Sequence, residues 1–132
     1  MLKSKILVAD DDKDMCWVIK TILRKEGYSV NIAHEGESAL NMIKKGKYDM
    51  IVLDYKFSRL SGLAVLKKIR QIRPFLQTIM ISAFGNESVR LKAKELGAYA
   101  FLDKPFDIER LVEIMKNALI ERIDLDQKKI LK

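Results

Sequence analysis

The sequence has few of the residues on which many metal centres and catalytic sites depend. Cys16 is its one cysteine, so the chain cannot form an internal disulfide bond, a cysteine zinc cluster or a Cys-x-x-Cys redox pair. His34 is its one histidine, which argues against a histidine-based metal site and against a Ser-His-Asp triad. We therefore expect Cys16 to be an unreactive thiol within a helix and His34 to be a loop residue that follows a strand.

Long apolar runs and low-complexity tracts are also missing. No apolar run approaches the roughly 20 residues that a membrane-spanning helix needs, and residues 1–5 lead directly into a predicted strand instead of a signal-peptide core. The chain of 132 residues is 48% hydrophobic and 33% charged, which is typical of one globular domain. The sequence therefore predicts a single cytoplasmic domain without a membrane segment.

An excess of Lys and Arg gives the chain a formal net charge of +7. These residues occur in several predicted helices and do not form one stripe with interleaved aromatic residues, a pattern that would indicate nucleic-acid binding. A solvated, lysine-rich surface accounts for the charge. We do not expect this domain to bind nucleic acid directly.

Apolar runs alternate with amphipathic segments along the chain. The predicted strands comprise residues 5–9, 28–33, 48–54, 78–82 and 99–103, and the predicted helices comprise residues 15–26, 38–45, 62–73, 87–96 and a last helix capped by Asp107. A glycine or a proline follows each of the first four helices. Such alternation predicts an α/β fold in which right-handed crossovers join parallel strands.

The last helix overruns the predicted domain. Its apolar stripe extends to Leu119, and a ragged apolar spacing continues to Ile130. We expect a domain over residues 1–121 and a helical extension or linker over residues 122–132. Two interpretations of the extension remain open: a frayed polar terminus, or a linker helix that pairs with a copy of itself or leads to an effector domain.

The run from Tyr48 to Asp54 ends abruptly in a carboxylate. Its adjacent Ile, Val and Leu residues predict a strand buried on both faces, as in parallel sheets. Asp54 would then lie at the carboxyl end of that strand, where open α/β sheets bind ligands. We therefore take Asp54 as the reactive group.

Four strand ends carry polar groups that should meet at this edge of the sheet. They are Asp10 with Asp11, Asp54, Ser82 and Lys104. Neighbouring carboxylates raise one another's pKa unless a cation neutralises them, so the three aspartates predict a bound metal ion. Because every plausible ligand is an oxygen atom, Mg²⁺ is the first choice and Mn²⁺ the second.

Ser82 and Lys104 suit a phosphoryl group beside that metal. Asp54 would attack a phosphorus atom in line, while Mg²⁺ and Lys104 stabilise the equatorial oxygens, and the product would be an acyl phosphate. Taken singly, each residue has a plainer explanation, because acids after strands often cap helices and a Ser or Lys at a strand end is usually solvated. The combination at four strand ends is what favours phosphoryl chemistry.

The motifs at the strand ends resemble, in order and spacing, those of the receiver domain of two-component response regulators. They are Asp10-Asp11, Asp54, Ser82-Ala83 and Lys104-Pro105-Phe106. The resemblance covers about residues 5–118 and implies a flavodoxin-like, doubly wound (βα)5 sandwich with a parallel five-stranded sheet of order 2-1-3-4-5. It also implies a signalling domain that is not a conventional enzyme but catalyses its own phosphorylation and dephosphorylation.

The resemblance implies a role for each acidic residue of the site. Asp54 would be the phosphoacceptor. Asp11 and Asp54, with the backbone carbonyl of Lys56, would bind Mg²⁺ directly, and Asp10 would act through a water molecule. The phosphoryl donor would be a histidine kinase, a phosphotransfer protein or a small acyl phosphate.

The resemblance also implies which residues hold the phosphoryl group and respond to it. Ser82, the backbone of Ala83 and Lys104 would bind the phosphoryl oxygens, and a cis peptide bond before Pro105 would aim the lysine at them. Ser82 and Phe101 match the switch pair, in which the serine turns to the phosphoryl group and the aromatic ring fills the vacated space. The alternative is that Phe101 is a plain core residue.

Two surfaces are candidates for contact with partners. Inward movement of Phe101 would reshape the face formed by residues 87–96, residues 99–103 and the last helix, which would control an output domain, with transcription the expected output, or would pair with a second copy. Trp17 lies opposite the main apolar arc of the first helix. It is either a docking residue for the phosphodonor or a partly covered surface residue.

The sequence departs from the family pattern near the site. Ser58-Arg59 stands where a Pro-Gly pair is usual, and Phe101 replaces the commoner Tyr or His. Lys56 and Phe84 occupy positions at which the family tunes the lifetime of the phosphoryl group.

Three other functions compete with this interpretation. A phosphatase of the haloacid-dehalogenase type needs a second acid two residues after the nucleophile, where this chain has Lys56. A flavodoxin-like FMN protein needs a phosphate loop rich in Ser, Thr and Gly, whereas Asp10, Asp11 and Asp12 would repel a phosphate. A receiver-like module that is never phosphorylated usually lacks an acid or the lysine, and both are present here.

Overall fold

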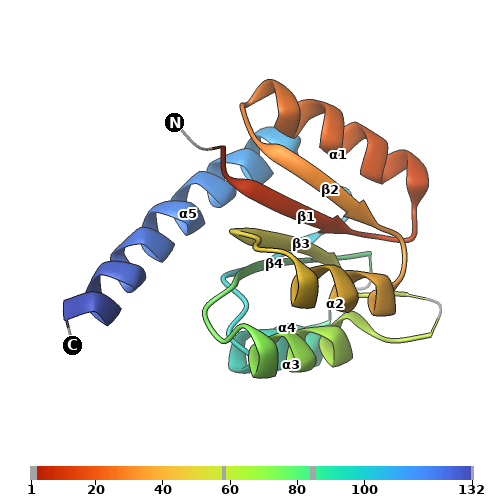
Figure 1. Cartoon of the computed structure of the whole chain (residues 1–132). Coiled ribbons are helices and arrows are strands. Elements are labelled where there is room, and N and C mark those ends of the chain that lie inside the picture. Colours follow the sequence, from red (N-terminus) through yellow and green to blue (C-terminus); the bar gives the residue numbers. More distant parts are fainter. Residues whose placement is uncertain (1–2, 58, 84–85, 132) are drawn as a thin grey trace.

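The computed structural model describes residues 3–57, 59–83 and 86–131, with side chains described as far as residue 121 (Figure 1). Five strands alternate with five helices. The strands are β1 (Lys5–Ala9), β2 (Ser29–Ala33), β3 (Met50–Asp54), β4 (Gln77–Ser82) and β5 (Ala100–Asp103), and the helices are α1 (Lys13–Lys25), α2 (Gly36–Lys45), α3 (Gly62–Ile72), α4 (Glu87–Glu95) and α5 (Ile108–Leu131). Each element that the sequence predicts is therefore present.

The five strands are parallel and form one sheet of order β2-β1-β3-β4-β5, which confirms the expected α/β fold and strand order. Figure 1 shows α1 and α5 on one face of the sheet and α2, α3 and α4 on the other. No helix in the described part of the chain is both long and apolar enough to cross a membrane. The carboxyl ends of all five strands therefore meet at one edge, between two helical layers.

The central strand β3 is buried on both faces. Met50 and Val52 pack toward α1 and α5, while Ile51 and Leu53 pack toward α2 and α3. This double burial explains why the strand appears in the sequence as a continuous apolar run rather than as an alternating pattern. It also holds the end of the strand, Asp54, in a fixed position.

Polar side chains cap the starts of α1, α3 and α4. The Asp12 carboxylate accepts a hydrogen bond from the backbone N–H of Met15 at 3.1 Å, so α1 begins at Lys13, two residues before the predicted start. The prediction was late because it assigned Asp12 to an anionic loop rather than to a cap. Ser61 and Asn86 cap α3 and α4 in the same way.

Helix α5 extends past the body of the domain. Leu111, Met115 and Ala118 are buried and anchor its first half against the sheet. The helix then continues to Leu131, and Figure 1 shows its C-terminal half projecting away from the sheet. The division into a domain and an extension at residue 121 stays a prediction.

Arg70 links α3 to the end of α4 and to the start of β4 through hydrogen bonds. Its guanidinium donates hydrogen bonds to the carbonyl oxygens of Leu96 at 2.7 Å, Leu76 at 2.8 Å and Gly97 at 3.1 Å. It also donates to the Thr78 hydroxyl oxygen at 3.0 Å. One partly buried cation thereby joins α3 to the end of α4 and to the start of β4.

We expect Arg70→Gln to lower the free energy of unfolding by about 2–4 kcal/mol, because several hydrogen bonds to a charged group are lost together. The matched control is Arg110→Gln, which removes the same charge from an exposed position on α5 and should change stability by less than about 0.5 kcal/mol. Urea denaturation followed by circular dichroism measures both variants. An equal fall in the free energy of unfolding of the two variants would show that the hydrogen bonds of Arg70 add no stability.

Candidate functional site

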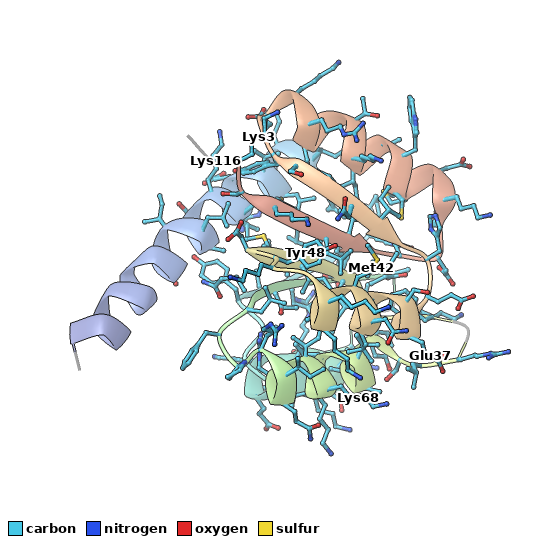
Figure 2. The ribbon with its side chains drawn as sticks, in the orientation of Figure 1. Lys3, Glu37, Met42, Tyr48, Lys68 and Lys116 are labelled. Carbon is cyan, nitrogen blue, oxygen red and sulfur yellow. The ribbon has the colours of Figure 1, made fainter. Side chains whose placement is uncertain are left out.

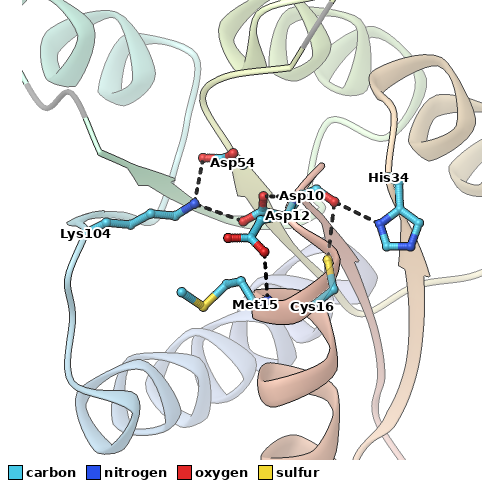
Figure 3. A network of polar contacts seen from close by, with 7 residues as sticks. All are labelled: Asp10, Asp12, Met15, Cys16, His34, Asp54 and Lys104. Carbon is cyan, nitrogen blue, oxygen red and sulfur yellow. Dashed lines mark hydrogen bonds and ion pairs between the residues drawn. The ribbon is translucent and has the colours of Figure 1, made fainter.

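Charged groups from three strand ends meet at the carboxyl edge of the sheet (Figure 3). Asp10 follows β1, Asp54 ends β3, and Lys104 follows β5. The Lys104 Nζ atom lies 3.1 Å from Asp10 Oδ2 and 3.5 Å from Asp54 Oδ1. The two aspartates are only 2% and 5% exposed, so the lysine is needed to offset two charges that have lost most of their contact with water.

Asp11 completes a cluster of three carboxylates. One oxygen atom from each of Asp10, Asp11 and Asp54 lies within 4.8 Å of the other two. Asp11 is exposed, so the cluster is reached from solvent although its other two members are buried. Oxygen donors at this spacing fit a hard divalent cation such as Mg²⁺, which keeps some of its own water molecules.

The electrostatics of this cluster act mainly on Asp54. Burial, and then the negative charge of Asp10, raise the pKa of Asp54 to about 7, against the opposing effect of Lys104. Burial also disfavours the charge of Lys104, but the two aspartates outweigh that effect and raise the pKa of the lysine. Lys104 is therefore protonated at neutral pH, while Asp54 needs further positive charge nearby to be fully ionised.

Asp10 is held from several sides. Its Oδ1 atom accepts a hydrogen bond from the backbone N–H of Asp12 at 2.9 Å. Its carbonyl oxygen accepts one from the Cys16 thiol at 3.3 Å, and Nδ1 of His34 lies 3.1 Å from the same oxygen. Figure 3 shows the contacts of Cys16 and His34 at the backbone of Asp10, and those of Asp12 and Lys104 at its carboxylate, so both parts of the residue are held in place.

The sequence did not reveal these supporting contacts of Cys16 and His34. Burial, and then the charges of Asp10 and Asp12, raise the pKa of Cys16 to about 12, which disfavours the reactive thiolate form. His34 directly follows β2, the strand that pairs with β1, and this adjacency was the one available signal. It becomes informative only when the strand order is known.

Ser82 ends β4, the strand that lies between β3 and β5. The residue is 1% exposed, and its carbonyl oxygen accepts a hydrogen bond from the backbone N–H of Lys104 at 2.8 Å. The next residue, Ala83, is exposed, and the peptide bond between Lys104 and Pro105 is cis. All four strand ends singled out in the sequence therefore lie at one edge of the sheet.

Phe101 is half-buried in β5, and the guanidinium of Arg90 lies over its ring. The guanidinium carbon of Arg90 lies 4.8 Å from the centre of the Phe101 ring, and the same guanidinium forms an ion pair with Asp103. The sequence did not suggest this role for Arg90, which belongs to α4.

The loop after β3 returns closely to Asp54. Lys56 pairs with Ser61 in a short antiparallel bridge. A Cβ atom at Gly62 would overlap the carbonyl oxygen of Asp54, so the start of α3 approaches the phosphoacceptor candidate through a glycine. The sequence assigned Gly62 to a helix start but gave no reason for the absence of a side chain there.

The structure describes two of the remaining residues singled out in the sequence. Trp17 is 67% exposed on α1, and Arg59 is exposed in the loop after β3. Ser58 and Phe84 fall outside the described residues. A docking role for Trp17 stays a prediction.

Comparison with known proteins identifies the family. The family model described as "Response regulator receiver domain" matches residues 6–116. Sporulation initiation phosphotransferase F of Bacillus subtilis is 32% identical over 119 residues, which are 90% of this chain and 96% of that protein. Transcriptional regulatory protein ZraR of Salmonella typhimurium is 33% identical over 117 residues, which are 89% of this chain and 26% of ZraR. The chain thus spans about a quarter of the length of ZraR.

Solved structures show the same fold. A response regulator receiver domain protein (CheY-like) from Methanospirillum hungatei JF-1 superposes with a TM-score of 0.91 at 28% sequence identity, over 93% of this chain and 98% of that one. Receiver domains bind Mg²⁺ through acidic residues, which the cluster of Asp10, Asp11 and Asp54 provides. The chain belongs to the family of receiver domains of two-component response regulators.

Proposed function

We propose that this domain accepts a phosphoryl group on Asp54 from a phosphohistidine of a histidine kinase or phosphotransfer protein, and that the modification controls an output domain or a partner. The observation that carries the proposal is the contact of Lys104 with both Asp10 and Asp54, beside a third carboxylate. An ammonium group in this position can bind the oxygen atoms of an arriving phosphoryl group while it remains close to the acceptor.

Asp11 and Asp54, with the backbone carbonyl of Lys56, would bind Mg²⁺ directly, and Mn²⁺ would serve as an alternative. Both carboxylate oxygens of Asp10 already accept hydrogen bonds, which supports a contact through water for that residue. When bound, Mg²⁺ supplies positive charge that offsets the repulsion between the carboxylates and the phosphoryl oxygens. The raised pKa of Asp54 supports this need for a cation.

The transfer step needs little from the protein besides position and charge. An Asp54 oxygen forms a bond to phosphorus as the bond from phosphorus to the donor imidazole breaks, and the imidazole nitrogen keeps the electron pair. The Ser82 hydroxyl, the Ala83 N–H and the Lys104 ammonium would donate hydrogen bonds to the phosphoryl oxygens. Attack of water on phosphorus later releases phosphate and restores the carboxylate. The domain would thus catalyse only its own modification.

Ser82 and Phe101 would convert the modification into a change of surface. The Ser82 hydroxyl would bind the phosphoryl group, and Phe101 would turn into the space that it leaves. That turn would separate the ring from Arg90 and so loosen α4 from β5. The face formed by α4, β5 and α5 would then control an output domain or a homodimer. Relatives such as ZraR are transcriptional regulators, which supports a transcriptional output.

Incubation with acetyl phosphate and Mg²⁺ should add one phosphoryl group, detected by mass spectrometry, and Asp54→Asn should abolish the adduct because the nucleophilic oxygen is lost. Removal of Mg²⁺ with EDTA should also prevent it. The matched control is Asp12→Asn, which removes the same charge nearby but keeps a good cap for α1, and it should retain the adduct. An adduct of unchanged yield on Asp54→Asn would place the acceptor elsewhere.

The raised pKa of Asp54 makes the free energy of unfolding depend on pH. In the absence of a divalent cation, the folded chain retains the Asp54 proton up to about pH 7, whereas the unfolded chain loses it near the ordinary value of 3.8. The folded state therefore binds more protons between these pH values. For this group the free energy of unfolding falls as the pH rises through that range.

We expect wild type to lose roughly 2–4 kcal/mol of stability relative to Asp54→Asn between about pH 4 and pH 7, because asparagine cannot ionise. Addition of Mg²⁺ at pH 7 should recover part of that loss in wild type and little in the variant. Urea denaturation at several pH values measures both. A stability difference between the two proteins that does not change with pH would contradict the assignment.

A further inference from the structure

The excess positive charge is concentrated in one part of the molecule. Residues 36–73 comprise α2, β3, α3 and the loops that follow these elements, and they contain nine Lys and Arg but three Asp and Glu, so they carry +6 of the formal net charge of +7. The rest of the chain is nearly balanced, with 16 basic and 15 acidic residues. Helices α2 and α3 lie side by side on one face of the sheet (Figure 1), which brings Lys44 of α2 and Lys68 of α3 to the same surface.

A groove of about 490 Å³ lies between α2 and α3. Figure 2 shows two of its lining residues, Glu37 on α2 and Lys68 on α3. The lining combines three kinds of side chain: apolar Leu40 and Ile72, the amides Asn41 and Gln71, and the charged Glu37, Lys44 and Lys68. The apolar pair is largely buried and forms the floor, while the amides and lysines are exposed.

The groove is basic toward the end that lies away from Asp54. Both helices begin at the carboxyl edge of the sheet and end at the opposite edge. Glu37 is in the first turn of α2, whereas Lys44 is in its last turn. Arg73 follows α3 and donates a hydrogen bond to the carbonyl oxygen of Lys44 at 3.4 Å, which brings another cation to the same end.

Local interactions account for only part of this set of lysines. Lys44 and Lys45, in the last turn of α2, interact favourably with the helix dipole. Lys67 and Lys68 come before the last turn of α3 and gain little from that effect. Among the residues that the structure describes, no ion pair involves any of these four lysines. Their charge is available to a partner.

We propose that this α2–α3 groove binds an acidic segment of another polypeptide, with carboxylates at Lys44 and Lys68 and an aliphatic side chain over Leu40 and Ile72. Charge complementarity selects an anionic partner. The apolar floor fits an aliphatic side chain, and the groove lining has no aromatic ring on which a nucleic-acid base could stack. Glu37 would repel a continuous phosphate backbone but accepts a basic residue at the end of a peptide.

This surface lies on α2 and α3, whereas the proposed switch acts on α4, β5 and α5. A peptide in the groove leaves the carboxylate cluster open, because the basic end is at the other edge of the sheet. Binding therefore does not require phosphorylation. The test is carried out without Mg²⁺ or phosphodonor, so its result is independent of the function proposed for Asp54.

The experiment is an NMR titration of the ¹⁵N-labelled chain with two synthetic helical peptides, one built of Glu, Ala and Leu and one with Gln in place of every Glu. The Glu peptide should shift the amide signals of residues 37–45 and 67–73, and the Gln peptide should not at the same concentration. Lys44→Glu combined with Lys68→Glu should weaken binding about tenfold or more, because two attractions become repulsions.

The matched control is Lys92→Glu combined with Lys94→Glu, the same change of charge at exposed positions on α4. It should weaken binding by less than about threefold, since only screened long-range attraction is lost. An equal loss of peptide affinity in the two double variants would overturn the proposed binding in the groove, because attraction of the peptide to the net charge of the domain alone would explain it. Tighter binding of a duplex DNA oligonucleotide to residues 37–73 would overturn the choice of a polypeptide. Circular dichroism verifies that both variants are folded.

Discussion

The site depends on holding Asp10 and Asp54 side by side where water reaches them poorly. Burial, and then the charge of Asp10, raise the pKa of Asp54, and Lys104 limits this effect by contacting both carboxylates. The lysine comes from β5 and reaches past the end of β4, which is possible because all parallel strands end at one edge. One ammonium group does not balance three aspartates. The remaining negative charge favours a divalent cation at the carboxylate cluster.

The strands and helices could be predicted because each one leaves a pattern of apolar residues in its own part of the sequence. A strand buried on both faces, such as β3, must be apolar throughout, and a helix on the sheet must show one apolar side, so each element is visible in its own residues. Asp54 could be placed at a strand end for the same reason. The strand order was different: apolar patterns do not say which strands are neighbours, and the order 2-1-3-4-5 came from the family resemblance.

Features that depend on neighbours in space could not be predicted. The contacts of His34 with Asp10, and of Arg90 with Phe101, join residues whose proximity follows from strand order and helix packing. The charge of α2 and α3 was misleading for a related reason. In the sequence their lysines are separated by the apolar strand β3 and seem scattered, but the fold places the two helices together. The start of α1 was missed because one aspartate, Asp12, serves as a cap beside two that serve the site.

Helix α5 gives the domain a long mechanical arm. Its 24 residues correspond to roughly 36 Å of continuous helix, and its base is packed in the core close to the turn that carries Lys104. The half that projects beyond the packed residues is about 18 Å long, so a tilt of about 5° where it leaves the sheet moves the tip by about 1.6 Å. Adjustments too small to alter the packing of the sheet can therefore become displacements of more than an ångström at the far end of this helix.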